Sequence, residues 1–470
     1  MLHHNKQIIT AKPLNFSHKL TPAQLFSHLS DQPWAMWLDS CQSDHVDSHY
    51  DIIVWQPEIT LITEGDITTI DFCSASQSDN RRQQSTEDPI ELLQNLQGDF
   101  FKTIEIEPQS LPFLTGAVGY CAYDLGRRFE ELSSHAIKDI NMPEMAMGIY
   151  SQAIIFDNTT QQFQLICSEQ KRASLEKSLL STIADPTSPA SSPFKLTKNW
   201  QSNISALEYQ NKFEQIQQYL LSGDCYQINL TQRFTSQYHG DEFSAYLKLR
   251  EHNQAPFSAF IRLDDHAILS ISPERFVRVC QQKVQSKPIK GTMVRSLDKL
   301  EDEKNATALK NSTKDKAENL MIVDLLRNDI SKVCIPGTVK VPHLFDIESF
   351  PAVHHLVSTV EGTLSPEFDG FDLLKAAFPG GSITGAPKIR AMEIIDELEP
   401  QRRSIYCGSI GYFSACGNMD SNITIRTLVC QKNNIHCWAG GGIVADSQVD
   451  EEYQESLDKV NKILPILKRM

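Results

Sequence analysis

The chain has 470 residues, 40% of them hydrophobic and 22% charged, with a formal net charge of −15 and a pI near 5.4. These values are typical of a globular protein with two or three domains. The acidic balance argues against a nucleic-acid-binding protein, whose surface is normally basic, but it is compatible with a locally positive pocket for a small anion.

The cysteines and the N-terminus indicate a cytoplasmic protein. The 11 cysteines are an odd number and form no Cys-x-x-Cys pair, which argues against a disulfide framework and against a thiolate zinc site. The first residues lack the apolar core of a signal peptide. No stretch approaches the roughly 18 apolar residues of a membrane span, so we expect no contact with a membrane.

The N-terminal part is predicted to be rich in strands. Residues 51–55, 59–63 and 150–156 gather β-branched and aromatic side chains, which is typical of strands. Residues 74–88 are polar and nearly free of aliphatic side chains, and they predict a loop.

A linker rich in Pro and Ser is predicted at residues 185–193. It lies between strand-rich sequence and the amphipathic helix predicted for residues 206–222. We therefore expect an N-terminal domain over residues 1–195 and a C-terminal domain over residues 200–470.

The C-terminal part predicts an α+β fold with an antiparallel sheet. Helical and strand patterns alternate irregularly, unlike the regular alternation of a doubly wound parallel sheet. Residues 424–429 and 435–439, joined around Asn433 and Asn434, predict a hairpin.

Two predicted helices carry acidic stripes. Glu318 lies in the helix predicted for residues 314–330, and Glu452 and Glu455 share one face of the last helix, which begins near Asp450. Most stripes of this kind are solvated surface, so neither indicates a function alone. Two stripes on separate helices can instead share a hard cation such as Mg²⁺, which takes one or two carboxylates and substrate oxygens.

Two glycine-rich segments are candidate ligand contacts. Gly440, Gly441 and Gly442 follow one another, and residues 380–388 read GGSITGAPK before a predicted helix. Glycine lets a backbone approach a ligand closely, and a helix N-terminus attracts anions. The alternative reading of both segments is a simple turn, and the spacing of a nucleotide-binding P-loop is absent.

Arg426 and Lys290 are candidate cationic contacts. Arg426 alternates with apolar residues in NITIRTLV, which predicts a strand with Arg426 on its polar face, suited to binding a carboxylate; a solvated sheet gives the same pattern. Lys290, in KPIKGT, has an ordinary pKa near 10.4. It becomes a nucleophile only if burial or a nearby cation lowers that pKa.

Taken in order, the segments resemble the chorismate-utilising enzymes, which include anthranilate, aminodeoxychorismate, isochorismate and salicylate synthases. The resemblance covers about residues 220 to 460, and it is specific because the segments occur together in one order: YQINLTQRF, SISPERF, PIKGT, KAENLMIVDLLRND, HHLVSTVEG, FPGGSITGAPK, GSIGYF, ITIRT, AGGGIVADS and EEYQESLDK. It implies a large, mainly antiparallel β-sheet sandwich flanked by helices.

The resemblance also implies roles at matching positions. The implied catalytic pair is Lys290 and Glu274, and the implied Mg²⁺ ligands are Glu318 and Glu455, with Glu452 as a second acidic residue near the metal. The implied chorismate contacts are Arg426, Tyr406, Ser382, Gly441, Gly442, Thr292 and His355.

Two positions choose among the family members. Lys290 matches the pattern of enzymes that aminate chorismate at C4, whereas anthranilate synthases usually have alanine there. Gln227 stands where isochorismate and salicylate synthases carry the lysine that activates water, and glutamine is no such base. The resemblance therefore implies amination at C4 through a covalent Lys290 intermediate, giving 4-amino-4-deoxychorismate, on the route to 4-aminobenzoate and folate.

The resemblance implies a partner and a second ligand. No cysteine has the Gly-x-Cys-x-Gly setting of a glutaminase, so we expect ammonia from a separate glutamine amidotransferase subunit in a heterodimer. The N-terminal domain of relatives can hold tryptophan, for which Ser40 in WLDS is the candidate contact. Two alternatives stay open: an anthranilate synthase component I, and a chorismate-binding regulatory protein without turnover.

Overall fold

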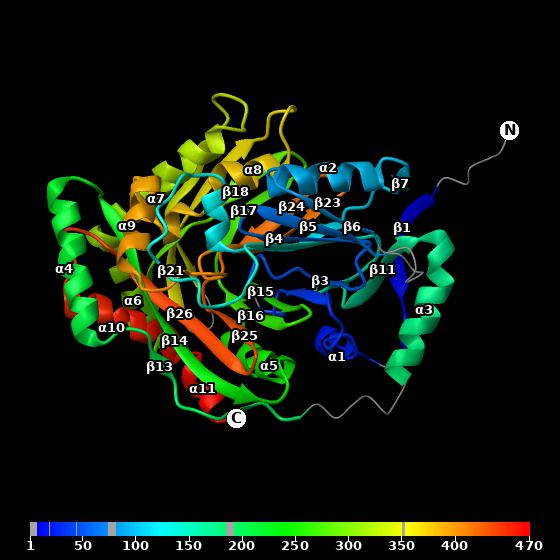
Figure 1. The fold of residues 1–470 in the computed structure, drawn as a ribbon, viewed down its shortest axis with the longest axis horizontal. Helices are drawn as coiled ribbons and strands as arrows, with labels where there is room; N and C mark the ends of the chain where they lie inside the picture. The colour runs from blue at the N-terminus through cyan, green and yellow to red at the C-terminus, as the bar shows by residue number, and fades with distance from the viewer. Residues whose placement is uncertain (1–6, 18, 44, 74–80, 185–191, 350–352) are drawn as a thin grey trace.

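Two large β-sheets form the body of the protein (Figure 1). The computed structural model describes residues 7–17, 19–43, 45–73, 81–184, 192–349 and 353–470. Over these residues one sheet has 14 strands and the other has 12. Their strands pair antiparallel, except that β1 and β7 run parallel.

The first sheet contains the hairpin that ends in the glycine run. Its order along the sheet is β12 (Lys195–Leu196), β14 (Gln227–His239), β26 (Asn434–Ile443), β25 (Thr427–Gln431), β16 (His266–Ser272), β15 (Phe257–Arg262), β2 (Met36–Asp39), β3 (Tyr50–Val54), β10 (Ala153–Asp157), β11 (Gln162–Ser168), β1 (Gln7–Leu14) and β7 (Ile104–Ile106), with β13 (Gln201–Ser202) and β22 (Gly385–Ala386) also paired to β14.

The second sheet carries the predicted catalytic pair. Its order is β19 (Ile289–Val294), β21 (Val353–Thr363), β18 (Lys283–Ser286), β17 (Arg275–Cys280), β24 (Met419–Asn422), β23 (Ser409–Ser414), β8 (Gly116–Cys121), β9 (Met145–Tyr150), β4 (Ile59–Glu64), β5 (Ile67–Phe72) and β6 (Arg81–Ser85), with β20 (Lys340–Ser349) also paired to β21.

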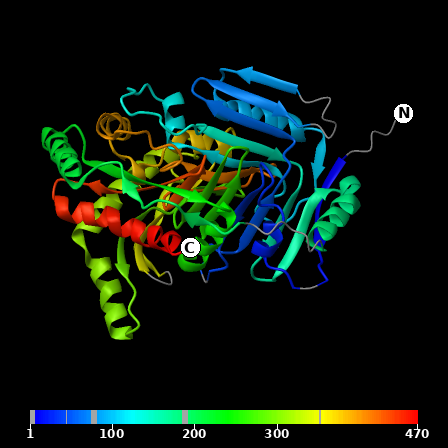
Figure 2. The same cartoon turned by 60° about the horizontal axis from the view of Figure 1, so that its bottom comes forward.

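Helices flank the two sheets, and several gather at one end of the molecule. Figures 1 and 2 show α4, α9 and α10 at the end opposite α3. The described residues form α1 (Pro22–Ser27), α2 (Pro89–Phe101), α3 (Glu169–Ala184), α4 (Ala206–Ser222), α5 (Glu242–Asn253), α6 (Lys299–Asn311), α7 (Thr313–Ser331), α8 (Gly370–Ala377), α9 (Lys388–Leu398), α10 (Val449–Asn461), α11 (Leu464–Lys468) and the short 3₁₀ turns η2 (Tyr123–Arg128) and η3 (Gly381–Ile383).

Strands from before residue 195 and after residue 200 share both sheets. β2 pairs with β15 in the first sheet, and β8 pairs with β23 in the second. An aromatic cluster continues this mixing, because Phe26 and Trp37 pack against Phe243 and Phe260 with ring centroids 5.3–6.3 Å apart. The division into two domains at residues 195–200 stays a prediction.

The predicted antiparallel α+β fold is confirmed, and most predicted elements are present. α4 has the predicted bounds, and its N-terminus is closed by a capping box between Ser205 and Glu208. The predicted hairpin is β25–β26, whose turn residues Lys432 and Asn433 have the positive φ angles of a tight hairpin turn.

Three local predictions are wrong or fall outside the described residues. Residues 150–156 do not form one strand, because the chain turns between β9 and β10 at Ser151 and Gln152. The predicted loop at 74–88 includes strand β6, and its residues 74–80 lie outside the described part, as do residues 185–191 of the predicted linker.

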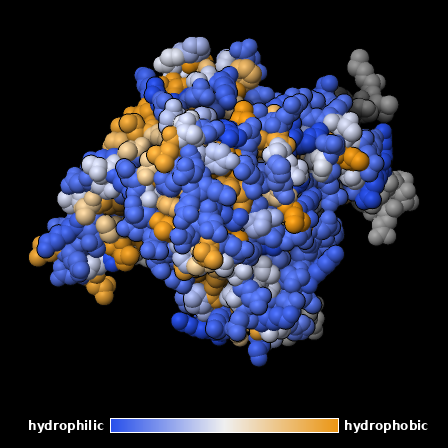
Figure 3. Space-filling model, turned by 60° about the vertical axis from the view of Figure 1, so that its left-hand side comes forward, coloured by the Kyte–Doolittle hydropathy of each residue, from blue (hydrophilic) through white to orange (hydrophobic). Residues whose placement is uncertain are grey.

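The surface carries mainly polar side chains on the face that includes α4, α9 and α10. Figure 3 shows this face as largely hydrophilic, with smaller hydrophobic areas toward its left-hand edge. Within the described residues, no helix combines the length and the apolar character that crossing a membrane requires.

Candidate active site

The glycines at the end of β26 make space for acidic side chains from two helices. A Cβ atom on Gly442 would lie 2.7 Å from Glu318 Oε1 on α7, and one on Gly441 would lie 3.1 Å from Glu452 Oε2 and 3.5 Å from Glu455 Oε1 on α10. Because glycine has no Cβ, a carboxylate from α7 can approach β26 at Gly442, and carboxylates from α10 can approach it at Gly441.

Each of these three carboxylates is paired with a lysine. The ion pairs are Lys290–Glu318 (2.7 Å), Lys459–Glu455 (2.7 Å) and Lys314–Glu452 (3.2 Å). Lys290 and Lys314 each also interact electrostatically with both Glu318 and Glu455. The two predicted acidic stripes therefore converge on one region, where their negative charge is balanced by cations.

The donor chemistry of this region suits a hard cation. Over the described residues, no group of three or more His, Cys, Asp or Glu side chains is arranged to hold a metal ion. Mg²⁺ needs only one or two protein carboxylates when the substrate and water supply the other oxygens. Glu318 beside Gly442 and Glu455 beside Gly441 fit a site of this open kind once a cation replaces their lysine partners.

Lys290 lies in β19 with a buried side chain that is 12% exposed. Its ammonium donates to Glu318 Oε1 at 2.7 Å and to the carbonyl oxygen of Ser382 at 3.0 Å. Burial disfavours the charged amine, but the nearby carboxylates, Glu318 first, outweigh burial and raise the pKa of Lys290. The amine is therefore protonated in this arrangement and must lose a proton before it acts as a nucleophile.

Glu274 directly precedes β17 and is connected to Lys290 through Ser382. The hydroxyl of Ser382 donates to Glu274 Oε1 at 2.9 Å, while the carbonyl of the same serine accepts from Lys290. Burial raises the pKa of Glu274 to about 7, although Lys290 and the Ser382 hydrogen bond act in the opposite direction. A carboxyl with this pKa is suited to proton donation near neutral pH.

His355 and Thr292 face each other across the β19–β21 ladder. They are cross-strand partners, and Thr292 Oγ1 lies 2.9 Å from His355 Nδ1. Burial, followed by the charge of Arg426, lowers the pKa of His355 to about 3. The imidazole is therefore neutral at physiological pH, and it contributes a polar ring rather than a charge.

Arg426 lies in a break between strands, which corrects the predicted strand at residues 424–429. β24 ends at Asn422 and β25 begins at Thr427, and Arg426 has a φ angle of 51°, in the left-handed region. Its charge interacts with Glu274 and His355, and no carboxylate in the described part of the chain forms an ion pair with it. Such a cation is suited to bind a carboxylate of a ligand.

Tyr406 is the remaining predicted contact. It is buried, and its ring stacks on Trp438 of β26 with centroids 6.2 Å apart and planes 7° apart. The stacking holds Tyr406 against the strand that carries the glycine run. The predicted contacts thus come from both sheets and from the turns that follow them.

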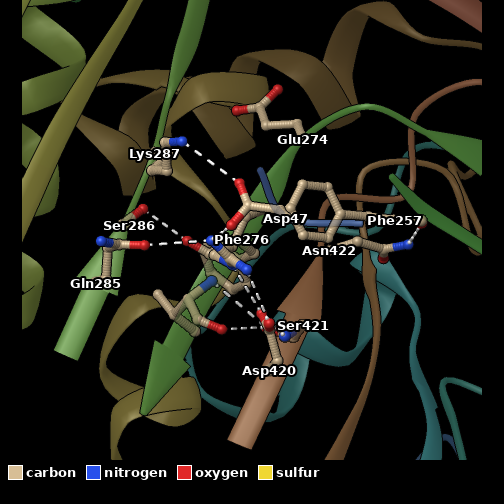
Figure 4. A network of polar contacts seen from close by, with 12 residues as sticks. Asp47, Phe257, Glu274, Phe276, Gln285, Ser286, Lys287, Asp420, Ser421 and Asn422 are labelled. Carbon is tan, nitrogen blue, oxygen red and sulfur yellow. Dashed lines mark hydrogen bonds and ion pairs between the residues drawn. The ribbon is translucent and has the colours of Figure 1, made fainter. Parts of the chain in front are cut away.

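Ser40 lies apart from these residues, beside a cavity of about 570 Å³ that is also lined by Arg275 and Lys287. Its hydroxyl donates to Asp51 Oδ1 at 2.6 Å. Arg275 binds Asp420 and Asp47, and Figure 4 shows Glu274 pointing away from both carboxylates. Two successive residues at the start of β17 therefore have different surroundings: the Glu274 side chain contacts Ser382, and the Arg275 side chain lines the cavity.

Two polar residues contact the predicted metal ligands in ways that the sequence analysis did not predict. Gln227 donates from Nε2 to Glu318 Oε1 at 2.7 Å. Lys459 donates to the carbonyl of Gly440 at 2.7 Å in addition to its ion pair with Glu455. The i, i+4 spacing of Glu455 and Lys459 is a signal that predicts their ion pair, whereas no local pattern predicts the contact between Gln227 and Glu318.

The chain belongs to the family of chorismate-binding enzymes. A family model described as "chorismate binding enzyme" matches residues 33–465. Aminodeoxychorismate synthase component 1 of Klebsiella aerogenes is 53% identical over 442 residues, covering 93% of this chain and 95% of the relative. The protein of that name in Escherichia coli K12 is also 53% identical, over 94% of this chain and 95% of its own length.

A solved structure supports the same conclusion for the fold. The crystal structure of anthranilate synthase component I from Streptococcus pneumoniae superposes with a TM-score of 0.78 at 31% identity, covering 90% of this chain and 93% of that one. The resemblance that the ordered motifs indicated is therefore confirmed, and the identity of 53% to two proteins named aminodeoxychorismate synthase component 1 exceeds the 31% to this anthranilate synthase component I. The roles of individual residues stay predictions.

We expect Glu274→Gln to change how folding stability depends on pH. The folded protein keeps the Glu274 proton up to about pH 7, whereas the unfolded chain releases it near the ordinary value of 4.5. The wild type therefore loses stability as pH rises between these values, by an amount on the order of 2 kcal/mol. Urea-unfolding midpoints at about pH 5 and about pH 8 should show a smaller loss for the variant.

The exposed Glu131→Gln is the matched control, and it should keep the pH dependence of the wild type. If Glu274→Gln and Glu131→Gln gave the same change between the two pH values, the burial of an ionisable carboxyl at position 274 would be the wrong explanation.

Proposed function

We propose that the chain aminates chorismate at C4, using ammonia released by a separate glutamine amidotransferase subunit, and forms 4-amino-4-deoxychorismate. The observation that carries the proposal is the connection of Lys290 and Glu274 through Ser382, beside Glu318. The 53% identity to relatives named aminodeoxychorismate synthase component 1 supports the same reaction. The product would feed the synthesis of 4-aminobenzoate and folate.

Lys290 and Glu274 divide the proposed reaction between them. Lys290 first releases its proton to water, once Glu318 no longer holds the ammonium. The neutral amine then attacks C2 of chorismate, and the protonated Glu274 donates its proton to the C4 hydroxyl, which leaves as water. The attack leaves a positive charge on the nitrogen of Lys290. The Glu274 carboxylate then takes a proton from this nitrogen. Ammonia attacks C4, the Lys290–C2 bond breaks, and the proton lost by the incoming nitrogen balances the one that Lys290 regains.

The other side chains would bind and orient the dianionic substrate. Arg426 and Tyr406 are proposed to bind the carboxylate of the enolpyruvyl arm, because Arg426 is a partly buried cation without a carboxylate partner in the described residues. The backbone of Gly441 and Gly442 and the hydroxyl of Ser382 would contact the ring, with Thr292 and the neutral His355 beside it.

Mg²⁺ is the proposed cofactor, held by Glu318 and Glu455 with Glu452 nearby. When bound, it would supply positive charge that holds the ring carboxylate of chorismate and neutralises the two glutamates. The donor oxygens and the space beside the glycines support this assignment. The lysine partners of these glutamates would be displaced, and Lys290 would then be free to face the ring.

The partner is proposed to be a glutamine amidotransferase, which would supply ammonia by hydrolysing glutamine. The relatives are named as component 1, which implies a further component in those proteins. Free ammonium should substitute for the partner in vitro. This substitution allows the reaction to be tested on the purified chain alone.

We expect the purified chain to convert chorismate to aminodeoxychorismate when Mg²⁺ and ammonium are present. The product is detected with a lyase that releases 4-aminobenzoate from it. Lys290→Ala should lose the trappable covalent adduct and reduce turnover roughly 10²- to 10⁴-fold, because the nucleophile is gone. The exposed Lys283→Ala on β18 is the control, with turnover equal to that of the wild type.

Three results would decide against parts of this proposal. Fluorescent anthranilate as the product would favour an anthranilate synthase component I, and the absence of any product would favour a chorismate-binding regulatory protein. An adduct that still forms in Lys290→Ala would exclude Lys290 as the nucleophile.

Glu455→Gln tests the metal assignment. We expect the concentration of Mg²⁺ needed for half-maximal activity to rise at least roughly 10-fold, since loss of a ligand weakens metal binding at least as much as loss of a group that hydrogen-bonds to a ligand. Isothermal titration with Mg²⁺ gives an independent readout of affinity. Glu451→Gln, exposed on the same helix, should leave both values unchanged, and equal behaviour of the two variants would contradict the assignment.

Tryptophan is proposed as a ligand of the cavity beside Ser40. The volume of about 570 Å³ and a lining that mixes cations with apolar side chains suit an amino acid with a large ring. The folded protein is first desalted and then denatured, and mass spectrometry of the released small molecules should detect about one tryptophan per chain if binding is tight. Absence of the ligand together with no stabilisation of the chain by added tryptophan would exclude this site.

A further inference from the structure

A fully buried arginine connects three segments of the candidate site. Arg403 is 1% exposed, and it forms two hydrogen bonds to the carboxylate of Glu399, at 2.9 and 2.7 Å. Its remaining donors reach two backbone carbonyls, that of Ile383 at 2.9 Å and that of Asn229 at 2.6 Å. The guanidinium also lies over the ring of Tyr123, 4.9 Å from the centroid.

Each segment that Arg403 contacts carries a residue of the site or pairs with one. Ile383 follows Ser382, which hydrogen-bonds to both Lys290 and Glu274. Asn229 is the cross-strand partner of Gly442 in the β14–β26 ladder. The third segment is the turn of Arg403 itself, where the amide of Tyr406 donates to the carbonyl of Arg403 at 3.0 Å.

Glu399 extends the same connection to β14. One of its carboxylate oxygens accepts from the amide of Thr231 at 3.0 Å and from the hydroxyl of Thr231 at 2.8 Å. Thr231 pairs with Gly440 at the start of the glycine run. The ion pair between Glu399 and Arg403 therefore holds β14 opposite the glycines at two points, while Arg403 holds the turn that contains Ser382.

Stability alone does not explain a pair of this kind. Removing two charges from water is costly, and apolar residues of similar volume are often equally stabilising. A planar guanidinium offers several donors at fixed angles, which lets it fix two carbonyls and a carboxylate relative to one another. Arg403 is therefore better suited to fixing the relative positions of these groups than to stabilising the fold.

We propose that Arg403 is a positioning residue of the amination reaction, which sets the backbone at Ile383 so that Ser382 holds Lys290 and Glu274 in register with the glycine run. The inference rests on the proposed function, because the reaction is its readout. Arg403 touches neither the substrate nor the reacting atoms in this role. It acts through the segment that contains Ser382.

The test compares Arg403→Lys with a matched control, Arg172→Lys. Arg172 is also buried and also holds two strands through carbonyls, donating to Leu165 at 3.1 Å and to Thr10 at 2.8 Å. It lies at the β11–β1 end of the first sheet, far along the strand order from β14 and β26. Both substitutions keep the positive charge and remove the planar guanidinium with its several donors.

We expect Arg403→Lys to lower kcat with ammonium roughly 10- to 100-fold, because small displacements of reacting groups have effects of this size. The KM for chorismate should change less than about threefold, and the rate of adduct trapping at Lys290 should fall with kcat. Arg172→Lys should lower the thermal midpoint by a similar amount and keep the kcat of the wild type. Equal kcat values for the two variants, after correction for the folded fraction, would overturn the proposal.

A second variant covers the case in which Arg403→Lys does not fold. The double change Arg403→Met with Glu399→Met replaces the ion pair by apolar side chains, which buried sites often tolerate. A folded double variant should show the same loss of kcat, and a wild-type kcat would overturn the proposal.

The wild type separates the two levels of inference. If it makes another product from chorismate, the proposed function fails. The ratio of the kcat of Arg403→Lys to that of Arg172→Lys, measured on that product, then still decides the role of Arg403. If it makes no product under any condition, both inferences fail.

Discussion

The largely buried ion pair between Lys290 and Glu318 is the interaction on which the candidate site depends. Glu318 accepts hydrogen bonds from both Lys290 and Gln227 on the same oxygen. A buried carboxylate without a positive partner is costly, by several kcal/mol. A cation therefore has to stay beside Glu318 at every stage, whether it is the ammonium of Lys290 or an ion that takes its place.

The two sheets explain how this pair comes to face the other groups of the site. Lys290 and β17, which Glu274 directly precedes, belong to the second sheet, whereas the glycine run belongs to the first. α7 brings Glu318 from outside both sheets to the end of β26. Because no single sheet or helix holds all the groups, the site exists only where these layers meet, and its geometry follows from their packing.

The sequence predicted the fold class and the family, for identifiable reasons, whereas the roles of the site residues stay predictions. Helical spacing grouped Glu452 with Glu455, and the structure places both beside Gly441 and places Glu318 beside Gly442. The order of the motifs identified the family, which the comparisons confirmed. Arg426 was predicted in a strand because its neighbours alternate, but its left-handed backbone ends the strand before it.

Other features had no signal in the sequence because they depend on tertiary contacts. The carbonyl that accepts from Lys290 belongs to Ser382, 92 residues away, and backbone groups carry no side-chain pattern. Arg403 was missed for the same reason, since two of its partners are carbonyls. The protonated state of Lys290 likewise follows from the closeness of Glu318, which helix spacing alone does not give.

The sharing of both sheets by early and late strands has a consequence for synthesis on the ribosome. β2, at Met36–Asp39, has an edge that is completed only by β15, at Phe257–Arg262. One edge of β8 is likewise completed only by β23, which is synthesised almost 300 residues later. The nascent chain must therefore carry exposed, apolar strand edges for much of its translation. Chaperone binding to the growing N-terminal half, rather than its independent folding, is the expected route to the finished sandwich.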